Sequence, residues 1–324
     1  MRRHTSSGVI LILLASTFFG LSGPLAKVLM EAGLHPLEVT WLRVAGSGLL
    51  LTCAAIPAIR RAFRERQRLP VAGLIGFGLA AIAGVQAFYF LAVARLPVGV
   101  ALLLEFTGPI LVVAWIRWVR HTRLPRAALT GALLSLAGLA FVVDIWTGLR
   151  LDALGLLAGA AAAACQAGYF LAGETLTNKV STPVLLSFGF GVGVLALAPL
   201  AQPWNMDWTV LSHRVSLGGF DFTAVVILAA LIVFTGLAYA TGLPALRMLS
   251  AAVAGGMAYT EVVVAAIAAW ILLGESLTPS QMFGGLLVIV GVFTAQRAVA
   301  VKNSDTDTPP TADAPLTTES RVVP

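Results

Sequence analysis

Residues 100–110 read VALLLEFTGPI, an apolar run that contains one carboxylate, Glu105. The flanking residues are apolar enough to lie in lipid. An acidic side chain at the centre of a membrane helix costs about 2.5–3.5 kcal/mol on insertion scales, so it is rarely retained without a polar cavity or a partner. The stretch therefore predicts a membrane helix that places a polar side chain on a path through the protein.

The composition of the whole chain favours a membrane protein. Hydrophobic residues make up 58% of the 324 residues and charged residues 11%, whereas a soluble domain is about a quarter charged. The mean hydropathy is +0.91 and the pI is about 9.9. The net charge of +6 does not indicate nucleic-acid binding, because the basic residues fall in short loops between apolar runs. Cys53 and Cys165 lie inside such runs and suggest no disulfide framework.

Apolar runs bounded by charged residues, Pro or Gly predict an all-α membrane protein with ten transmembrane helices. A helix needs about 20 apolar residues to cross a bilayer. The expected spans are 8–30, 37–59, 70–94, 97–117, 126–145, 153–175, 183–201, 221–244, 250–273 and 279–298. The first run is too long for a signal peptide and has no cleavage site, so it is expected to be a retained span. The longest connection is expected over residues 202–220.

The basic residues predict the orientation of the chain. With a cytoplasmic N-terminus, the outer side holds only Arg95, Arg150 and Arg214. The cytoplasmic side holds the remaining Arg and Lys apart from Lys27 and Arg43, which lie within spans. Cytoplasmic loops carry such an excess, so both termini are expected inside. Residues 1–7 then form a cytoplasmic N-terminus. Residues 299–324 are rich in Thr, Pro and Asp and are expected to be a disordered cytoplasmic tail.

The chain also aligns with itself. The aligned residues are Gly8 and Gly155, Leu29 and Leu176, Pro36 and Pro183, and Gly46 and Gly193 at one offset, then Leu124 and Leu277, Gly131 and Gly284, and Gly138 and Gly291 at another. The change of offset fits a longer outer loop in the second half. Two repeats are therefore expected, 8–145 and 153–298, joined outside the membrane by 146–152. Five spans in each place the halves in opposite orientations, an inverted repeat typical of secondary transporters that bind substrate at the repeat interface.

Two basic side chains in or near the spans are candidates for binding substrate. Lys27 either contacts an anionic substrate group or extends its ammonium to the outer membrane interface. Arg43 keeps its proton and needs an anion, carbonyl groups or water. It either binds a substrate carboxylate through paired hydrogen bonds or holds a helix carboxylate in place.

Glu105 and Glu261 are the acidic candidates, for substrate binding and for proton coupling. Burial disfavours the charged form of a carboxyl group, so either acid is suited to carry a proton. Alternatively, it stays ionised and binds a substrate ammonium, or it forms a salt bridge with Arg43 or Lys27. Glu275, in the outer turn before the last span, is interpreted as solvated.

Uncharged polar groups on the same helices are further candidates for hydrogen bonds to substrate. They are Gln86, Tyr89, Gln166 and Tyr169. Such residues also join helices, for less than about 2 kcal/mol each. The sequence contains no nucleotide-binding loop, nucleophilic serine motif or metal-ligand cluster. No enzyme activity, cofactor or metal is therefore expected.

Residues 272–285, LLGESLTPSQMFGG, together with the ten spans and the repeat, resemble the EamA family of the drug/metabolite transporter superfamily. The similarity covers about residues 8–298. Within the family, residues 25–27 (LAK), Arg43, residues 105–109 (EFTGP) and residues 164–169 (ACQAGY) resemble the branch of bacterial threonine/homoserine exporters.

The resemblance implies an exporter of small amino acids or related metabolites in the bacterial inner membrane, driven by the proton gradient. Alternating access is expected because buried acids and bases coexist in a bundle built from two repeats. It supports Lys27, Arg43, Glu105 and Glu261 as site residues. The branch usually has Pro after the glutamate of the ninth span, whereas residues 259–262 here read YTEV, which would straighten that helix. An exporter or passive facilitator of other drugs or metabolites therefore remains an alternative, and a membrane enzyme or sensor is a remote one. The sequence does not indicate an oligomeric state.

Overall fold

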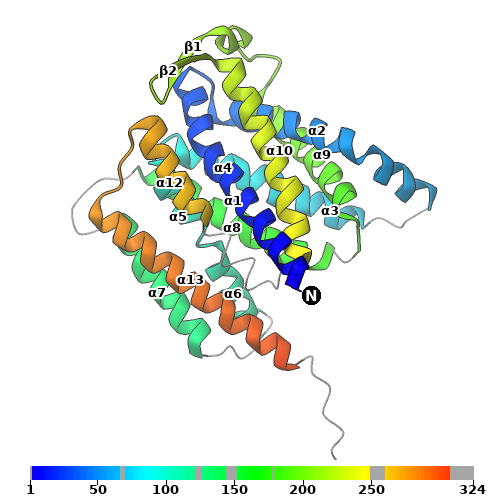
Figure 1. Ribbon diagram of the computed structural model, residues 1–324, viewed down its shortest axis with the longest axis vertical. Helices are drawn as coiled ribbons and strands as arrows, with labels where there is room; N and C mark the ends of the chain where they lie inside the picture. Colours follow the sequence, from blue (N-terminus) through cyan, green and yellow to red (C-terminus); the bar gives the residue numbers. More distant parts are fainter. Residues whose placement is uncertain are drawn as a thin grey trace, which may run out of the picture.

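The structure is a computed structural model that describes residues 2–65, 70–119, 121, 126–143, 152–176, 179–248 and 260–306. Helices make up most of these ranges (Figure 1). The first half contains α1 (Arg2–Glu31), α2 (Pro36–Arg64), α3 (Val71–Phe77), the π-helix η1 (Gly78–Gly84), α4 (Val85–Val93), α5 (Val98–Glu105), α6 (Gly108–Trp118) and α7 (Arg126–Val143). The second half contains α8 (Ala153–Leu176), α9 (Thr182–Ala201), the short 3-10 helix η2 (Trp208–Ser212), α10 (Ala224–Met248), α12 (Thr260–Leu273) and α13 (Pro279–Thr306).

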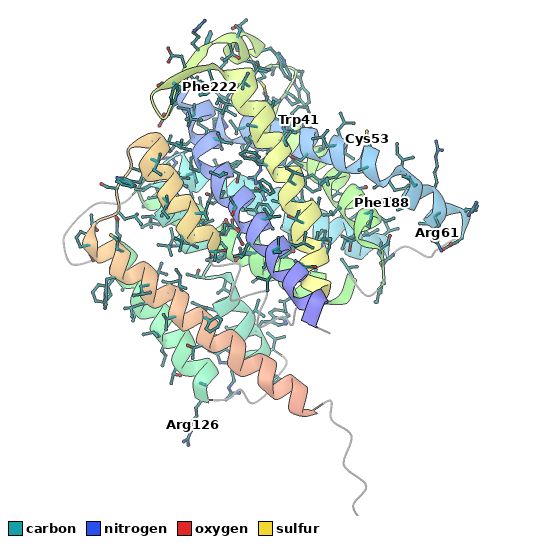
Figure 2. All side chains as sticks on the ribbon, viewed as in Figure 1. Trp41, Cys53, Arg61, Arg126, Phe188 and Phe222 are labelled. Atoms are coloured by element: carbon teal, nitrogen blue, oxygen red, sulfur yellow. The ribbon has the colours of Figure 1, made fainter. Side chains whose placement is uncertain are left out.

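The prediction of a helical membrane protein is confirmed. Within the described residues, the helices long and apolar enough to cross a membrane are Ser7–Glu31, Pro36–Ala62, Val71–Val93, Thr182–Ala201 and Ala224–Ala245. Shorter apolar helical stretches cover Val98–Val112, Ala153–Tyr169, Thr260–Leu273 and Pro279–Gly291. Large apolar side chains such as Leu49, Leu157 and Leu195 are exposed on the outward faces, as is Cys53 on α2 (Figure 2). Faces of this kind suit lipid rather than water.

The prediction of an all-helical chain is wrong in one place. Strands β1 (Arg214–Leu217) and β2 (Phe220–Thr223) pair as an antiparallel hairpin, so the helix expected from residue 221 begins at Ala224. Gly218 and Gly219 form the turn with φ of +60° and +83°. Tight hairpin turns favour glycine where both central residues have positive φ.

Two expected spans are interrupted. Residues 70–94 comprise α3, η1 and α4, and residues 97–117 comprise α5 and α6, which are separated just after Glu105. Pro109 has no backbone N–H to donate and is therefore tolerated in the first turn of α6. The Thr107 hydroxyl donates to the Leu104 carbonyl at 2.6 Å. Interrupted helices in transporters often line a binding site.

Helix packing follows the internal repeat. Helix α1 packs against α10 and α12, and its counterpart α8 packs against the α3–η1–α4 segment and against α5 and α6. Helix α2 packs against its counterpart α9, and α7 packs against α13 beside the main bundle (Figure 1). The other counterparts are the α3–η1–α4 segment and α10, the α5–α6 segment and α12, and α7 and α13. If each element is replaced by its counterpart, the same pairs of neighbours result. Two similar halves related by a twofold axis would pack in this way.

Glycines that the repeat aligns form the contact between α7 and α13. A Cβ on Gly138 would lie 2.6 Å from the carbonyl oxygen of Gly284, and a Cβ on Gly291 would lie 2.6 Å from that of Gly131. Each contact is the counterpart of the other. The Ser135 hydroxyl donates to the Gly131 carbonyl at 3.0 Å. The two backbones therefore approach as closely as small residues allow.

We expect Gly138→Ala to lower the unfolding temperature of the purified protein in detergent by several degrees. The added methyl group meets backbone atoms, and overpacking of this kind typically costs about 1–3 kcal/mol. Gly236→Ala in α10 is the matched control, because its Cβ would meet nothing within 4 Å. Both variants gain the same helix propensity, so equal unfolding temperatures would contradict the packing described here.

Some predictions concern the chain ends and connections. Helix α13 continues to Thr306, so residues 299–306 are helical although they were expected to belong to the disordered tail. The rest of the tail, residues 307–324, lies outside the described residues. So do the first part of the expected ninth span, residues 250–259, and all but the last residue of the 146–152 linker.

Candidate functional site

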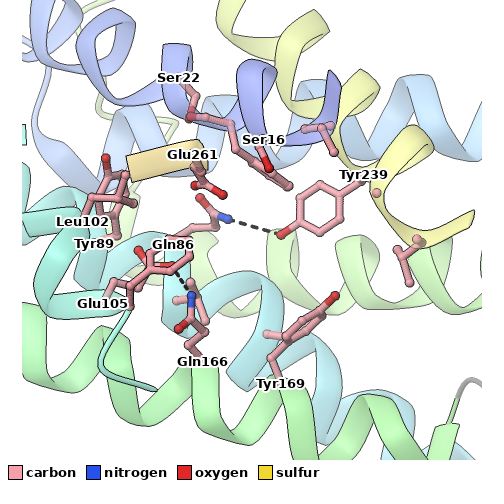
Figure 3. A pocket seen from close by; sticks show the side chains of 18 of the residues that line it. Ser16, Ser22, Gln86, Tyr89, Leu102, Glu105, Gln166, Tyr169, Tyr239 and Glu261 are labelled. Carbon is pink, nitrogen blue, oxygen red and sulfur yellow. Dashed lines mark hydrogen bonds between the residues drawn. The ribbon is translucent and has the colours of Figure 1, made fainter. Parts of the chain in front are cut away.

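A cavity of about 170 Å³ lies between the two halves of the bundle. Its walls come from α1, α2, η1, α4, α5, α8, α10 and α12. Every predicted site residue except Lys27 lines it (Figure 3). A cavity of about 150 Å³ accommodates a benzene-sized ligand, so this space suits a small solute.

Arg43 is held in place by neutral groups. Its side chain is buried, with 1% exposure. Nε donates to Thr235 Oγ1 and Nη1 donates to Gln86 Oε1, both at 2.6 Å, and the guanidinium lies 5.0 Å from the ring centre of Phe90. Within the described part of the chain, no ion pair joins Arg43 to a carboxylate. The structure therefore does not form the alternative salt bridge between Arg43 and Glu105 or Glu261.

Glu105 is the last residue of α5 and is buried beside the cavity. Its Oε1 accepts a hydrogen bond from Gln166 Nε2 at 3.0 Å (Figure 3). The C-terminal end of a helix carries partial negative charge, which favours a cation nearby. The break between α5 and α6 thus places a carboxylate and a helix end at the same wall of the cavity.

Gln166 also places a hydrogen-bond acceptor, its side-chain oxygen, near Glu105. Its buried Oε1 has no hydrogen-bond partner among the described residues. Gly108 makes room for this oxygen, because a Cβ there would lie 2.7 Å from it. A buried acceptor without a partner costs about 1–3 kcal/mol, so a donor from a bound solute or water would be favourable here.

Glu261 enters the cavity from the first turn of α12 (Figure 3). Gly20 of α1 lets α12 approach closely, since a Cβ on Gly20 would lie 2.9 Å from the Glu261 carbonyl oxygen. The side chain makes no ion pair with the residues that the structure describes. The cavity therefore contains one buried guanidinium and two carboxylates that do not pair with it.

The model of the EamA-like transporter family matches residues 6–144 and matches again over residues 153–295. The chain belongs to the EamA-like transporter family. The two matches coincide with the two predicted repeats. The family match confirms the resemblance found in the sequence. The family is one of transporters.

Several relatives of this EamA protein are named transporters. The threonine/homoserine exporter RhtA of Escherichia coli strain K12 is 30% identical over 279 residues, 85% of each chain. The uncharacterized inner membrane transporter YicL of Salmonella typhimurium strain LT2 is 24% identical over 292 residues, 89% of this chain and 94% of the relative. A crystal structure with 22% identity covers 90% of this chain and 98% of its own, with a TM-score of 0.59, and supports the fold alone.

Tyr239 lines the EamA cavity and was missed in the sequence. Its hydroxyl accepts a hydrogen bond from Gln86 Nε2 at 3.2 Å, and the two residues are 153 positions apart. This separation equals the repeat offset that aligns Gly138 with Gly291, so the repeat itself pairs Tyr239 with a residue already predicted. Ser16 and Ser22 on α1 also line the cavity. Small hydroxyl groups in an apolar helix gave no comparable signal.

Lys27 lies outside the cavity, and its Nζ forms an ion pair with Glu275 Oε1. Glu275 Oε2 also accepts a hydrogen bond from the backbone N–H of Val98 at 3.0 Å. The interpretation of Glu275 as a solvated residue is wrong, because its side chain is only 19% exposed. The ammonium of Lys27 is therefore paired with Glu275, away from the other predicted site residues.

Proposed function

We propose that this protein exports small amino acids, similar to threonine and homoserine, from the bacterial cytoplasm in exchange for protons. The observation that carries the proposal is the cavity, in which Arg43 has neutral hydrogen-bond partners and, among the residues that the structure describes, neither Glu105 nor Glu261 forms an ion pair. A zwitterion supplies both missing charges. Its carboxylate would face Arg43, and its ammonium would face Glu105 and the free oxygen of Gln166. The relatives named threonine/homoserine exporters support this substrate class.

The proposed architecture has ten spans in two inverted repeats, with both termini in the cytoplasm. The twofold packing pattern and the double family match support the repeats. Arg61 at the end of α2 and Arg126 at the start of α7 lie far from the hairpin that contains Phe222 (Figure 2). Because basic residues favour the cytoplasmic side, the hairpin would lie outside. The two halves then rock about the cavity, which opens to one side at a time.

Proton coupling follows if Glu105 binds either the substrate ammonium or a proton. Protonation forms an O–H bond on the carboxylate and removes the charge that attracts the ammonium, so the amino acid is released outside. The protonated carboxyl then returns to the inward-facing state, where the proton leaves and a new substrate binds. Each cycle moves one amino acid out and one proton in.

Transport by proteoliposomes tests the proposal. We expect labelled threonine or homoserine to move against its gradient when an opposing pH gradient is imposed, and accumulation to cease when a protonophore collapses that gradient. Equal flux with and without the gradient would indicate a passive facilitator instead. Absence of transport for every small amino acid would contradict the proposed substrate class.

The aromatic lining favours a second candidate, export of larger aromatic or cationic metabolites or drugs. Phe19, Tyr89, Phe106, Tyr169 and Tyr239 all line the cavity, and aromatic faces bind flat apolar groups and cations. Competition distinguishes the two candidates. An aromatic amine that displaces threonine poorly would favour the amino-acid exporter, and one that binds more tightly and is itself exported would favour the alternative. No enzyme activity is proposed.

A further inference from the structure

We propose that Lys27, Glu275 and the backbone N–H of Val98 form an outer latch, which closes the cavity toward the outside and must open to release substrate. The proposal rests on the alternating-access transport proposed above. None of the latch residues lines the cavity. Their part would lie in coupling the two halves, not in contacting substrate.

The latch joins the two halves through a single carboxylate. Glu275 lies between α12 and α13 in the second half, whereas Lys27 belongs to α1 and Val98 begins α5 in the first half. Glu275 Oε1 pairs with Lys27 Nζ, and Oε2 accepts from the Val98 N–H at 3.0 Å. That N–H belongs to the first turn of a helix, where backbone donors have no partner within the helix. Oε1 of Glu275 therefore contacts α1, which itself packs against α12, and Oε2 contacts α5.

The latch lies just beyond one end of the cavity. On α1, Lys27 follows the lining residue Ser22 by five positions, which is about 7.5 Å along a helix. On α5, Val98 precedes the lining residue Leu102 by four positions, which is about 6 Å. The two helices therefore extend from the cavity to the latch. Separating them at this end would open a path past Ser22 and Leu102.

The hairpin lies on the same side as the latch. The Gly218 N–H in its turn donates to the Leu272 carbonyl at 3.2 Å, three residues before Glu275. The end of the cavity next to the latch is therefore the end that faces outward in the proposed orientation. Closure here fits a state in which substrate enters from the cytoplasm.

The partial burial of the ion pair suits a contact that forms and breaks. The side chains of Lys27 and Glu275 are 21% and 19% exposed. Fully buried charges that lose their partner are strongly destabilising, and fully exposed pairs contribute little. At this intermediate burial, water can reach both groups as the helices separate, so the pair favours closure without preventing opening.

Labelling of a cysteine at position 22 tests the latch without any substrate. The test protein carries Cys53→Ser and Cys165→Ser, so that Ser22→Cys introduces its one thiol. A membrane-impermeant thiol reagent is added outside, and the rate of labelling measures how readily the reagent reaches the cavity. We expect Lys27→Met and Glu275→Gln each to raise the labelling rate about tenfold, within the usual range of coupling between sites. Asp152→Asn is the matched control. It breaks the Arg95–Asp152 pair, whose side chains are 45% and 40% exposed, and is expected to leave the rate unchanged.

Exchanging the charges provides a further check. Lys27→Glu combined with Glu275→Lys restores an attraction between the helices but removes the acceptor for the Val98 N–H, so we expect the rate to fall only part of the way back. Unchanged labelling in both single variants, when their unfolding temperatures show that they are folded, would overturn the latch. The labelling result tests the latch, and the transport result tests the proposed function, so the two can fail independently. Faster labelling without amino-acid transport would support the latch and refute the substrate, and transport with unchanged labelling would do the reverse.

Discussion

Glu105→Gln is expected to lower proton-driven export at least about tenfold, where each factor of ten corresponds to about 1.4 kcal/mol, and to abolish its dependence on external pH. Glutamine has nearly the same shape, and its carbonyl can still accept the hydrogen bond that Gln166 Nε2 now donates to Glu105. The fold should therefore be retained. What is lost is a group that carries either a negative charge or a proton.

The measurement is efflux of labelled threonine from proteoliposomes at several external pH values. Glu38→Gln is the matched control, since Glu38 Oε2 accepts from the His35 N–H at 2.7 Å at the start of α2, outside the cavity. That variant should export at the wild-type rate. If Glu105→Gln also exports at that rate and with the wild-type pH dependence, Glu105 does not couple protons to transport.

The two acids of the cavity are expected to differ in function because the repeat does not pair them. In the alignment, Glu261 corresponds to Gly108, and Glu105 corresponds to Ala258, which lies outside the described residues. Gly108 leaves room for the Gln166 oxygen, whereas Glu261 at the equivalent place projects a carboxylate into the cavity. Glu105 has Gln166 as a hydrogen-bond donor. This asymmetry fits the proposed cycle, in which Glu105 exchanges the ammonium for a proton and Glu261 adds a second negative charge to the cavity.

The sequence predicts most of the cavity because polar groups in lipid are costly and few. Arg43, Glu105 and Glu261 stand out in apolar runs for this reason, and the structure brings them to one cavity. The same reasoning fails for Lys27. Its partner Glu275 is 248 residues away, at a helix end where a charged residue is unremarkable, so only the packing of the two halves reveals the pair.

Local signals that were present in the sequence explain the remaining differences. Phe220 and Phe222 alternate with Asp221 after two glycines, a pattern typical of a hairpin, but their apolar character suggested a helix. Gly108-Pro109 marks the break after Glu105, because proline removes a backbone donor, yet the length of residues 97–117 favoured one span. In both cases the overall apolar content concealed a short irregular segment.

Replacing Arg43 with Met is expected to abolish the preference for amino acids over the corresponding amines that lack a carboxylate. Wild-type protein should favour the amino acid about 10- to 150-fold, as expected for charge-assisted hydrogen bonds of about 1.5–3 kcal/mol. Methionine fills a similar apolar volume but cannot bind the carboxylate. Competition of both compounds for threonine export in proteoliposomes measures the preference.

The stability of the same variant separates a binding role from a structural one. Without Arg43, Gln86 loses a donor but can still donate to the Tyr239 hydroxyl, and the Thr235 hydroxyl still donates to the Leu231 carbonyl. A buried charge replaced by an apolar side chain of similar size is often tolerated, so only a modest fall in unfolding temperature is expected. A folded Arg43→Met variant that keeps the wild-type preference would show that Arg43 does not contact the substrate carboxylate. Because Arg43 has no carboxylate partner among the described residues, the cavity would then hold an uncompensated charge with no assigned anion.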